Sequence, residues 1–256
     1  MSPPNILITG ATGGFGRATA RLFAARGYFV GLVDLDEDRL AGLAEELGGS
    51  ERAYFRALDV TDETGARELA AEFAAAAGGG IQVLFNNAGI SAVGDFTAVD
   101  IGTQRRVLEV NLFGVFNVTH ACLPYMRNTS GAHVITVSSA SAIHGNPELV
   151  AYAATKRALL SFSESLDISL RGTGVAVSDL LPMYAKTAIV EDVAHLHRKR
   201  PDIRLTAEDI ADEVWDIVRT RRFRSYVGAD TKVFARLAKL LPYRLVKYVT
   251  RRVVGW

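Results

Sequence analysis

Short apolar runs of strand length recur along this chain, and helical patterns fill the intervals between them. The runs are NILIT (5–9), YFVGLVD (28–34), RAYFRALDV (52–60), IQVLFNNAG (81–89), HVITVSS (133–139), GVAVSDLLP (174–182) and RSYVG (224–228). Apolar residues recur at helical spacing most clearly over 63–78, 104–126 and 152–171. This alternation predicts right-handed βαβ units, and therefore a doubly wound α/β fold in which helices cover both faces of a parallel sheet.

The length and composition favour one large domain followed by a tail. The chain has 256 residues, and 49% of them are apolar, which is enough for a sizeable core. We find no internal repeat and no low-complexity linker, and AAAAGGG at 74–80 is too short to mark a domain boundary. We therefore expect a single domain over 1–230 and a helical tail over 231–256.

Three features predict a cytoplasmic protein. We find no stretch long and apolar enough to span a bilayer, and no secretory signal before the first strand. The only cysteine, Cys122, cannot form an intramolecular disulfide, and its surroundings predict a small buried hydrophobe rather than a reactive thiol.

Charge is unevenly distributed along the chain. The net charge is +1, but from His195 onward 15 Lys/Arg stand against 7 Asp/Glu, a balance of +8. This asymmetry falls short of a nucleic-acid-binding surface, so we expect no nucleic-acid partner.

A glycine-rich loop follows the first apolar run. The segment ITGATGGFGRAT (8–19) places Gly10, Gly14 and Gly16 between a predicted strand and a predicted helix. Glycines let a pyrophosphate approach the backbone, and the helix N-terminus adds partial positive charge, so the loop predicts an anion site of the Rossmann type. The spacing is not GxGxxG, and a tight turn without a ligand is the alternative.

Two carboxylates end the next two strands. Asp34 lies 24 residues beyond Gly10, where a carboxylate can accept hydrogen bonds from an adenosine ribose and would repel a 2′-phosphate. The alternative is a helix N-cap, a role that Asp36 could equally fill. No Lys or Arg lies inside the glycine loop or directly after Asp34, which favours NAD. Asp59 and Val60 end the third strand, where a polar group can contact the edge of an adenine. The alternative is an ordinary cap at the end of the strand.

A possible acid–base pair lies in YAATK. Tyr152 and Lys156 are four residues apart and project from one helix face. An ammonium group stabilises a phenolate and lowers the tyrosine pKa from its usual value of about 10, which makes proton exchange with an alcohol feasible. Ser139 ends another strand and could hold the reacting oxygen. An exposed helix face is the alternative for the pair.

Together these segments resemble one family. TGATGGFG, Asp34, DV at 59, NNAG at 86, Asn111 in VLEVNLFG, Ser139 and YAATK are similar, in order and spacing, to the short-chain dehydrogenase/reductase family. The likeness covers residues 5 to about 228.

The resemblance implies roles for individual residues. Tyr152 would be the general acid/base, Lys156 would lower its pKa and bind the nicotinamide ribose, and Ser139 would orient the substrate carbonyl. Asn111 would hold a water in a proton relay, with a helix kink capped by its amide as the alternative. The implied cofactor-binding set is Gly10, Thr12, Gly14, Phe15, Gly16, Asp34, Asp59, Val60, Asn87, Ala88, Gly89, Tyr152, Lys156, Pro182 and Thr187.

The sequence departs from the family at two places. Pro182 is followed by Met183 where the family usually has glycine, and Met183 either re-aims the substrate side of the pocket or is tolerated. Thr187 still stands where the family's threonine holds the nicotinamide carboxamide. The late strand leads through SYVGADTK into the tail rather than into the family's Asp-Gly-Gly stretch.

Substrate contacts are expected in the least patterned segments. ASAIHGNPELV (140–150) should line the pocket, and we predict a mobile lid over about 183–205. The predicted substrate-binding residues are Ser139, Ser141, His144, Tyr152 and Met183. His144 is alternatively an exposed turn residue, which we slightly favour. The segment HLHRKR (195–200) is more typical of a solvated helix end than of a site for an anionic substrate. His195 and His197 have no Cys or acidic residue nearby at metal-ligand spacing, so no metal is expected.

The predicted function is NAD(H)-dependent interconversion of a secondary alcohol and a ketone by hydride transfer. A largely apolar pocket favours a hydrophobic small molecule: steroid-like, aromatic or alicyclic. The alternatives are an NADPH-dependent 3-oxoacyl thioester reductase, against which Asp34 speaks, and a non-catalytic NAD-binding sensor or scaffold. The resemblance also implies a homodimer or homotetramer.

The tail over 231–256 contains seven Lys/Arg and no acidic residue. Phe234, Leu237 and Leu241 form one apolar stripe at helical spacing; Leu245, Tyr248 and Val249 form another. Pro242 suits the first turn of a second helix, so two short amphipathic helices are expected. We favour packing of the stripes on the parent domain or a second subunit over peripheral contact with an anionic membrane.

Overall fold

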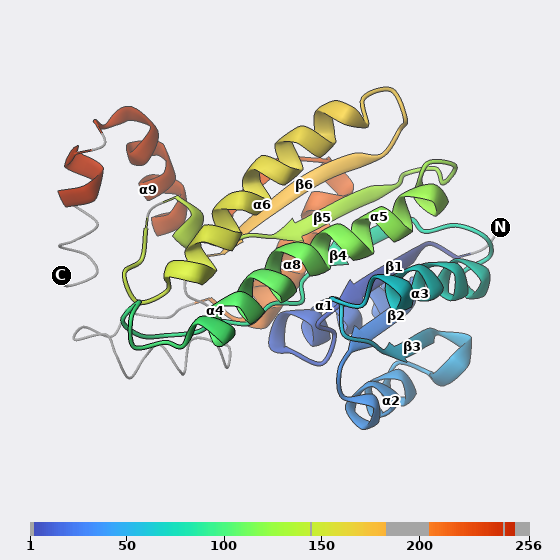
Figure 1. The fold of residues 1–256 in the computed structure, drawn as a ribbon. Helices are drawn as coiled ribbons and strands as arrows, with labels where there is room; N and C mark the ends of the chain where they lie inside the picture. The colour runs from blue at the N-terminus through green and yellow to red at the C-terminus, as the bar shows by residue number, and fades with distance from the viewer. Residues whose placement is uncertain (1–2, 144, 183–204, 243, 249–256) are drawn as a thin grey trace.

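A computed structural model of the chain describes residues 3–143, 145–182, 205–242 and 244–248. The strands are β1 (Asn5–Thr9), β2 (Phe29–Asp34), β3 (Ala53–Ala57), β4 (Val83–Asn86), β5 (His133–Val137), β6 (Ala176–Pro182) and β7 (Arg224–Val227). The helices are α1 (Gly14–Ala25), α2 (Glu37–Glu46), α3 (Glu63–Ala76), α4 (Ile101–Leu108), α5 (Gly114–Met126), α6 (Val150–Ser169), α8 (Ala207–Thr220) and α9 (Ala229–Leu240). Figure 1 shows the helices in two layers around the sheet, with the strands running side by side.

The sheet has seven parallel strands in the order β3-β2-β1-β4-β5-β6-β7. All seven predicted strands are present, so the predicted doubly wound Rossmann-type fold is confirmed. The chain builds outward in one direction from β1 to β3 and in the other from β4 to β7. Ligands bind such sheets in the crevice at the carboxyl ends of the strands beside this reversal, which here lies between β1 and β4.

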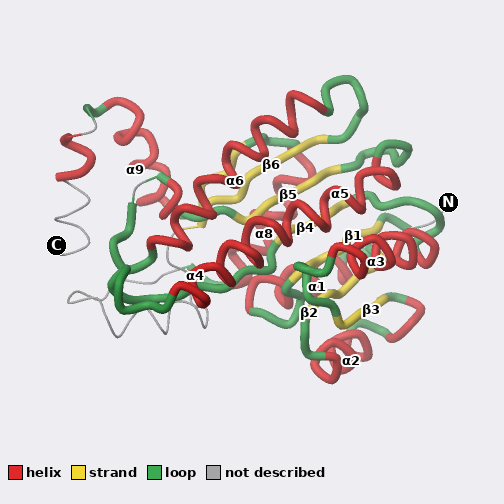
Figure 2. Tube along the Cα trace, in the orientation of Figure 1, coloured by secondary structure: helices red, strands yellow, loops and turns green. Residues whose placement is uncertain are grey.

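Each face of the sheet has its own hydrophobic core. Alternate side chains of β1 point to opposite faces, as the strand pleat requires: Leu7 packs with α3, α5 and α6, whereas Ile6 and Ile8 pack with α1, α2 and α8. All three are fully buried. Figure 2 shows the strands enclosed between helices. Cys122 lies in the first of these cores, as predicted, and burial raises the pKa of its thiol to about 12.

Several strands are shorter than the apolar runs that predicted them. The run 52–60 yields a strand only over Ala53–Ala57, and the run 81–89 only over Val83–Asn86. In both cases the residues beyond the carboxyl end of the strand, 58–60 and 87–89, line the crevice instead. The expected helix over 104–126 begins at Ile101 and is interrupted by a π-helical turn, η2 (Glu109–Phe113).

The helical stretch Ile101–Met126, which comprises α4, η2 and α5, contains an 18-residue window with a mean hydropathy of 1.2 and so has the length and composition of a membrane-spanning helix. The expectation that no stretch has this character is therefore wrong. It failed because Arg105, Arg106 and Glu109 interrupt the start of the stretch, whereas 110–126 contains no Asp, Glu, Lys or Arg. Helices that pack in a protein core pass the same test, and half of the apolar window is buried against the sheet and its neighbours.

The first helix of the tail begins two residues before the predicted boundary at 231. α9 starts at Ala229, directly after β7, and a second helical segment over 244–248 follows Pro242, in the position expected for it. Residues 249–256, with Val249, lie outside the described residues, as does most of the predicted lid. The side chain of Phe234 is also outside the description.

A buried histidine occupies the amino-terminal end of β5, far along the strand from the crevice. His133 Nε2 lies 2.7 Å from Ser178 Oγ, whose own proton is donated to the Arg222 carbonyl. The histidine therefore donates from Nε2. Burial, together with the charge of Arg221, lowers its pKa from 6.5 to about 4.

The burial of His133 predicts that the stability of the fold decreases in acid and that part of this decrease depends on His133. Between pH 6.5 and 4 the unfolded chain binds a proton that the folded chain does not, so stability is lost as the pH falls below 6.5. His133 should make the free energy of unfolding about 2 kcal/mol smaller at pH 5 than at pH 7. Urea unfolding of His133→Gln should lack this contribution, whereas His120→Gln, at an exposed position, should retain it. Equal pH dependence in all three proteins, or a His133 ring that titrates near 6.5 by NMR, would contradict the assignment.

Candidate active site

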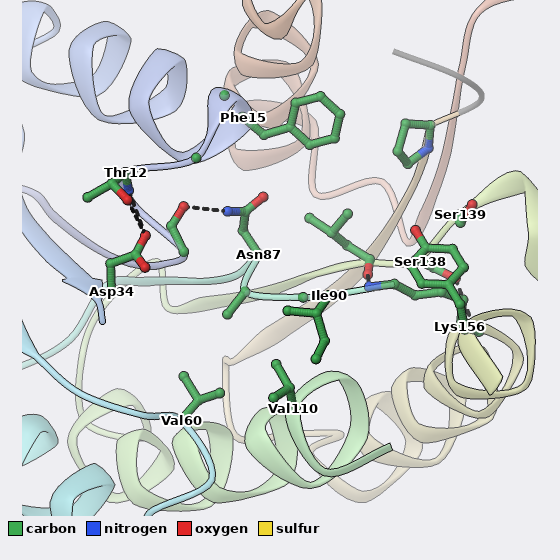
Figure 3. Close-up of a pocket in the computed structure, with 18 of the residues that line it drawn as sticks. Thr12, Phe15, Asp34, Val60, Asn87, Ile90, Val110, Ser138, Ser139 and Lys156 are labelled. Atoms are coloured by element: carbon green, nitrogen blue, oxygen red, sulfur yellow. Dashed lines mark hydrogen bonds between the residues drawn. The ribbon is translucent and has the colours of Figure 1, made fainter. Parts of the chain in front are cut away.

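A cavity of about 610 Å³ opens at the carboxyl edge of the sheet. Its walls come from the segments that follow β1, β2, β3, β4, β5 and β6, and from α6. Figure 3 shows Asp34 and Lys156 at opposite ends of this cavity, with Asn87 between them. The two ends offer different chemistry: one is lined by exposed charged groups and the other by buried ones.

The glycine loop brings bare backbone to the cavity wall. Gly10, Gly13 and Gly14 line the cavity, and α1 begins at Gly14 with no acidic residue in its first turn. Gly10 has φ +66°, and a Cβ on Gly16 would come within 2.2 Å of the Gly10 carbonyl oxygen. The tight loop therefore requires glycine at both positions, and it presents the positive end of a twelve-residue helix to the cavity.

Asp34 ends β2 and is held by the glycine loop. Its Oδ2 accepts from the Thr12 amide at 2.9 Å and from the Thr12 hydroxyl at 2.7 Å, and its Oδ1 accepts from the Leu35 amide. The N-cap of α2 is Asp36, whose side chain accepts from the Arg39 amide. The capping alternative for Asp34 is therefore wrong. Its carboxylate faces the cavity, with acceptor capacity left on Oδ1.

At this end of the cavity lies a basic side chain that the sequence did not indicate. Arg39 lines the cavity, and its Nη2 donates to the Thr12 carbonyl at 2.9 Å. Arg17 Nη2 lies 3.5 Å from the same oxygen. Neither lies in the glycine loop or directly after Asp34, because both reach the Thr12 carbonyl from helices. Arg39 lies in the first turn of α2, and this helical placement was the available signal.

The loop after β3 contributes a charged cluster at the same end. Asp59 Oδ1 accepts from the Thr61 amide and hydroxyl, and Oδ2 pairs with Arg106 of α4, which also contacts the Thr61 hydroxyl at 3.2 Å. Although partial burial opposes it, these hydrogen bonds and the Arg106 charge together lower the pKa of Asp59. Asp59, Val60 and Arg106 all line the cavity. Arg106 is the third basic residue, after Arg39 and Arg17, that the sequence did not indicate.

The segment after β4 ties the middle of the cavity to β1. The Asn87 side-chain amide donates to the carbonyls of Thr9 and Gly10, at 2.9 and 3.0 Å. The amides of Asn87 and Ala88 in turn donate to the Thr9 hydroxyl. A Cβ on Gly89 would lie 3.2 Å from Asn111 Oδ1, so a side chain there would crowd the groups behind it.

Asn111 lies in the π-helical turn between α4 and α5 and is fully buried. Its side chain accepts from the Ile90 amide and donates to the Ile90 carbonyl, both at 2.8 Å. The side-chain amide therefore fixes the backbone beside the cavity, and the helix is distorted where this happens. The predicted water-holding role is not tested by these contacts.

Lys156 and Tyr152 lie together on α6 at the other end of the cavity. Lys156 is 4% exposed, its Nζ donates to the Val137 carbonyl at 2.8 Å, and it lies 5.5 Å from the centre of the Tyr152 ring. Burial lowers the pKa of Lys156 from 10.5 to about 8, so the ammonium form still prevails at pH 7. A buried cation beside a phenol favours the phenolate more strongly than an exposed one would.

Ser139 faces the same end from the end of β5. Its Oγ accepts from the Ser141 amide at 3.2 Å, which leaves the hydroxyl proton free to be donated into the cavity. Ser139, Tyr152 and Lys156 all line the cavity, so the structure brings together three of the four predicted catalytic residues there. Asn111 lies directly behind the wall.

The described substrate side is mainly apolar. Ile90, Ala140, Leu149 and Pro182 line it, with Ser141 and Asn146 as the polar members. His144, Met183, Thr187, His195 and His197 lie outside the described residues. Within the described part of the chain, no group of three or more His, Cys, Asp or Glu side chains could hold a metal ion.

Comparison with known proteins gives consistent matches. The sequence model of a family described as short chain dehydrogenase matches residues 4–197. Sulfoacetaldehyde reductase 2 of Chromohalobacter salexigens is 35% identical over 218 residues, 82% of this chain and 86% of that protein. The 1-deoxy-11-beta-hydroxypentalenate dehydrogenase of Streptomyces exfoliatus is 34% identical over 235 residues, 90% and 85% of the two chains. A short chain dehydrogenase/reductase from Burkholderia phymatum, in complex with NAD, superposes with a TM-score of 0.82 at 28% identity, covering 92% of each chain.

The Arg106–Asp59 pair predicts a specific effect on cofactor affinity. If Arg106 orients the Asp59 carboxylate towards the adenine end of a bound dinucleotide, Arg106→Gln should raise the Kd for NADH roughly three- to tenfold. Binding of reduced nicotinamide mononucleotide, which lacks the adenosine half, should not change. Arg105→Gln is the matched control, since Arg105 is exposed on the same helix. Fluorescence titration measures both ligands, and an equal loss for the two would mean that Arg106 only supports the fold.

Proposed function

The chain belongs to the short-chain dehydrogenase family of oxidoreductases, and from this premise we propose that it interconverts a secondary alcohol and a ketone with NAD(H). The observation that carries the proposal is the pairing of two ends in one cavity: Asp34 beside the glycine loop, and Ser139, Tyr152 and Lys156 opposite. The spacing of these groups along one crevice suits a long dinucleotide and a small substrate together.

The residues present fit a nicotinamide dinucleotide. Gly10, Gly13 and Gly14 give the cavity a wall without side chains at the start of α1, which suits a pyrophosphate. Asp34 keeps acceptor capacity for the ribose hydroxyls, and Val60 offers an apolar contact for adenine. When bound, NAD(H) supplies hydride exchange with the substrate carbon.

The protein's own part in the reaction is proton transfer and positioning. In the direction of oxidation, the Tyr152 phenolate would take the hydroxyl proton of the alcohol, and in reduction the phenol would return it to the carbonyl oxygen. The positive charge of Lys156 would lower the free energy needed to deprotonate the Tyr152 phenol. The Ser139 hydroxyl would donate to the substrate oxygen and hold it near Tyr152.

The lining of the substrate side supports an uncharged, hydrophobic substrate. Among the described residues the guanidinium groups in the cavity, Arg39 and Arg106, are at the adenosine end, and the substrate side is mainly aliphatic. The hydroxy group in the name of the relative 1-deoxy-11-beta-hydroxypentalenate dehydrogenase agrees with an alcohol substrate. That name and sulfoacetaldehyde both denote anions, for which the described residues of the substrate side offer no cation besides Lys156.

The proposal extends to the protein's assembly and location. Exposed apolar side chains on α4, η2, α5 and α6 support a homodimer or homotetramer; they are Ile101, Leu108, Phe113, Phe116 and Ile168. A cytoplasmic location is supported by the single buried Cys122, since the chain can form no internal disulfide. We keep residues 1–230 as the catalytic unit and 231–256 as an appended tail.

Replacement of the proposed acid–base group gives the direct test of the chemistry. Tyr152→Phe keeps the ring but removes the exchangeable proton, so kcat in a cofactor-reduction screen of secondary alcohols should fall by roughly 10²-fold or more. NADH should still bind with nearly unchanged Kd. Tyr125→Phe, on α5 and away from the cavity, is the control. Substantial residual turnover in Tyr152→Phe would assign the proton transfer to another group, and no turnover of any alcohol or ketone by the native protein would favour a non-catalytic NAD-binding role.

The neighbourhood of Asp34 predicts how cofactor choice can be changed. Native kcat/KM should be higher with NAD than with NADP, because the Asp34 carboxylate would repel a 2′-phosphate. Asp34→Asn keeps a side-chain oxygen that can accept from Thr12 but removes the negative charge. Arg39 and Arg17, whose guanidinium groups lie at the Thr12 carbonyl, can then pair with the 2′-phosphate of NADP. The kcat/KM of this variant with NADP should therefore rise by about tenfold or more. The double variant Asp34→Asn, Arg39→Gln should lose most of that gain. Equal use of both cofactors by the native protein would contradict the assignment to NAD and favour the NADPH-dependent alternative.

A further inference from the structure

The first half of the tail is anchored along one side only. Thr231 and Ala235 of α9 are buried, at 0% and 4% exposure, and the Thr231 hydroxyl donates to the Val227 carbonyl at 2.7 Å. These residues attach the helix to the end of β7. Figure 1 shows α9 beyond the carboxyl ends of the strands. The cavity lies at the same ends of the strands.

The opposite side of α9 carries an uncovered apolar stripe. Val233, Leu237 and Leu240 are spaced i, i+4, i+7 and fall within about 60° of one another around the helix. They are 57%, 46% and 80% exposed. The stripe predicted from sequence was Phe234, Leu237 and Leu241, and it shares Leu237 with the exposed stripe. Leu237 does not pack on the parent domain, and its expected packing on a second subunit stays a prediction.

The second helical segment continues the apolar surface. After Pro242, Leu245 and Tyr248 are spaced i, i+3 and are 43% and 55% exposed. We call Val233, Leu237, Leu240, Leu245 and Tyr248 the tail surface. Five large side chains of this kind within sixteen residues are a concentration found nowhere else in the described part of the chain.

Basic residues border the tail surface. Lys232 and Arg236 are exposed on α9 and project along one flank of the stripe, and Arg244 and Lys247 are exposed on the second segment. The tail over 231–256 contains no acidic residue. A symmetric contact between two copies would place this surface against itself and bring like charges together, which is unfavourable. An anionic lipid surface instead complements both components, because it accepts apolar side chains and attracts cations.

From this combination of exposed apolar stripe and uniform positive charge, we propose that the tail surface is a peripheral binding site for anionic membranes. The helices would lie in the interface with the tail surface towards the acyl chains and the basic flank among the headgroups. Contact at this end of the molecule would hold the cavity mouth near the bilayer, where hydrophobic alcohols concentrate. The binding itself does not depend on the proposed reaction.

Vesicle sedimentation of the full chain tests the proposal. The native protein should sediment with vesicles of phosphatidylcholine and phosphatidylglycerol, much less with phosphatidylcholine alone, and less as salt is raised. Leu237→Gln with Leu240→Gln should weaken binding by roughly tenfold or more, and so should Lys232→Gln with Arg236→Gln. Both pairs are exposed and Gln is a good helix former, so folding should be retained.

Two double variants outside the tail control for nonspecific hydrophobic adsorption and for net charge. Phe55→Gln with Phe96→Gln removes exposed apolar side chains, and Arg127→Gln with Arg171→Gln removes exposed charges outside the tail. Neither pair should change vesicle binding. The proposal is overturned if the native protein does not bind anionic vesicles, or if the control pairs weaken binding as much as the tail pairs. A smaller oligomer for Leu237→Gln with Leu240→Gln by light scattering, without vesicle binding by the native protein, would assign the surface to a second copy.

Discussion

The cavity depends on a set of hydrogen bonds between the ends of β1 and β4. These two central strands are neighbours, but the chain leaves them towards opposite faces of the sheet. The hydrogen bonds between the paired strands therefore do not fix the residues that follow β1 and β4. The Thr9 hydroxyl accepts two amides of the β4 segment, and the Asn87 side chain returns two bonds to the β1 segment. The floor of the crevice is thereby rigid, and the glycine loop on one side and Gly89 on the other take their positions from it.

The two ends of the cavity control charge in different ways. At the Asp34 end, the carboxylates of Asp34 and Asp59 are partly exposed, and each accepts hydrogen bonds from a neighbouring threonine. At the Lys156 end, one cation is buried, and its ammonium group donates to the Val137 carbonyl. Low surrounding polarity makes its field stronger at short range, and the same burial brings its pKa close to the physiological range.

Sequence patterns predicted the strands and most residues of the cavity because both are encoded locally. Apolar runs gave the strands, and polar residues directly after them, such as Asp34 and Asn87, fell at the carboxyl edge by topology alone. Arg39 and Arg106 could not be found in this way, because each reaches the cavity from a helix whose rotation no strand spacing specifies. The same limit explains the tail, where the face of α9 that packs on β7 is decided by Thr231 and Ala235 rather than by the largest apolar side chains.

The π-helical turn at Glu109–Phe113 accommodates one residue more than a regular helical turn would. Because the extra residue is absorbed within a single turn, α4 and α5 keep the relative rotation of one continuous helix. Loss of one residue here would convert the turn to regular helix and leave Arg106 facing Asp59. The residues of the turn itself would move, and Asn111 would lose its two hydrogen bonds to the Ile90 backbone. The extra residue therefore serves the position of Asn111, and a single-residue deletion in the turn would alter the Ile90 side of the crevice while leaving the Asp59 side in place.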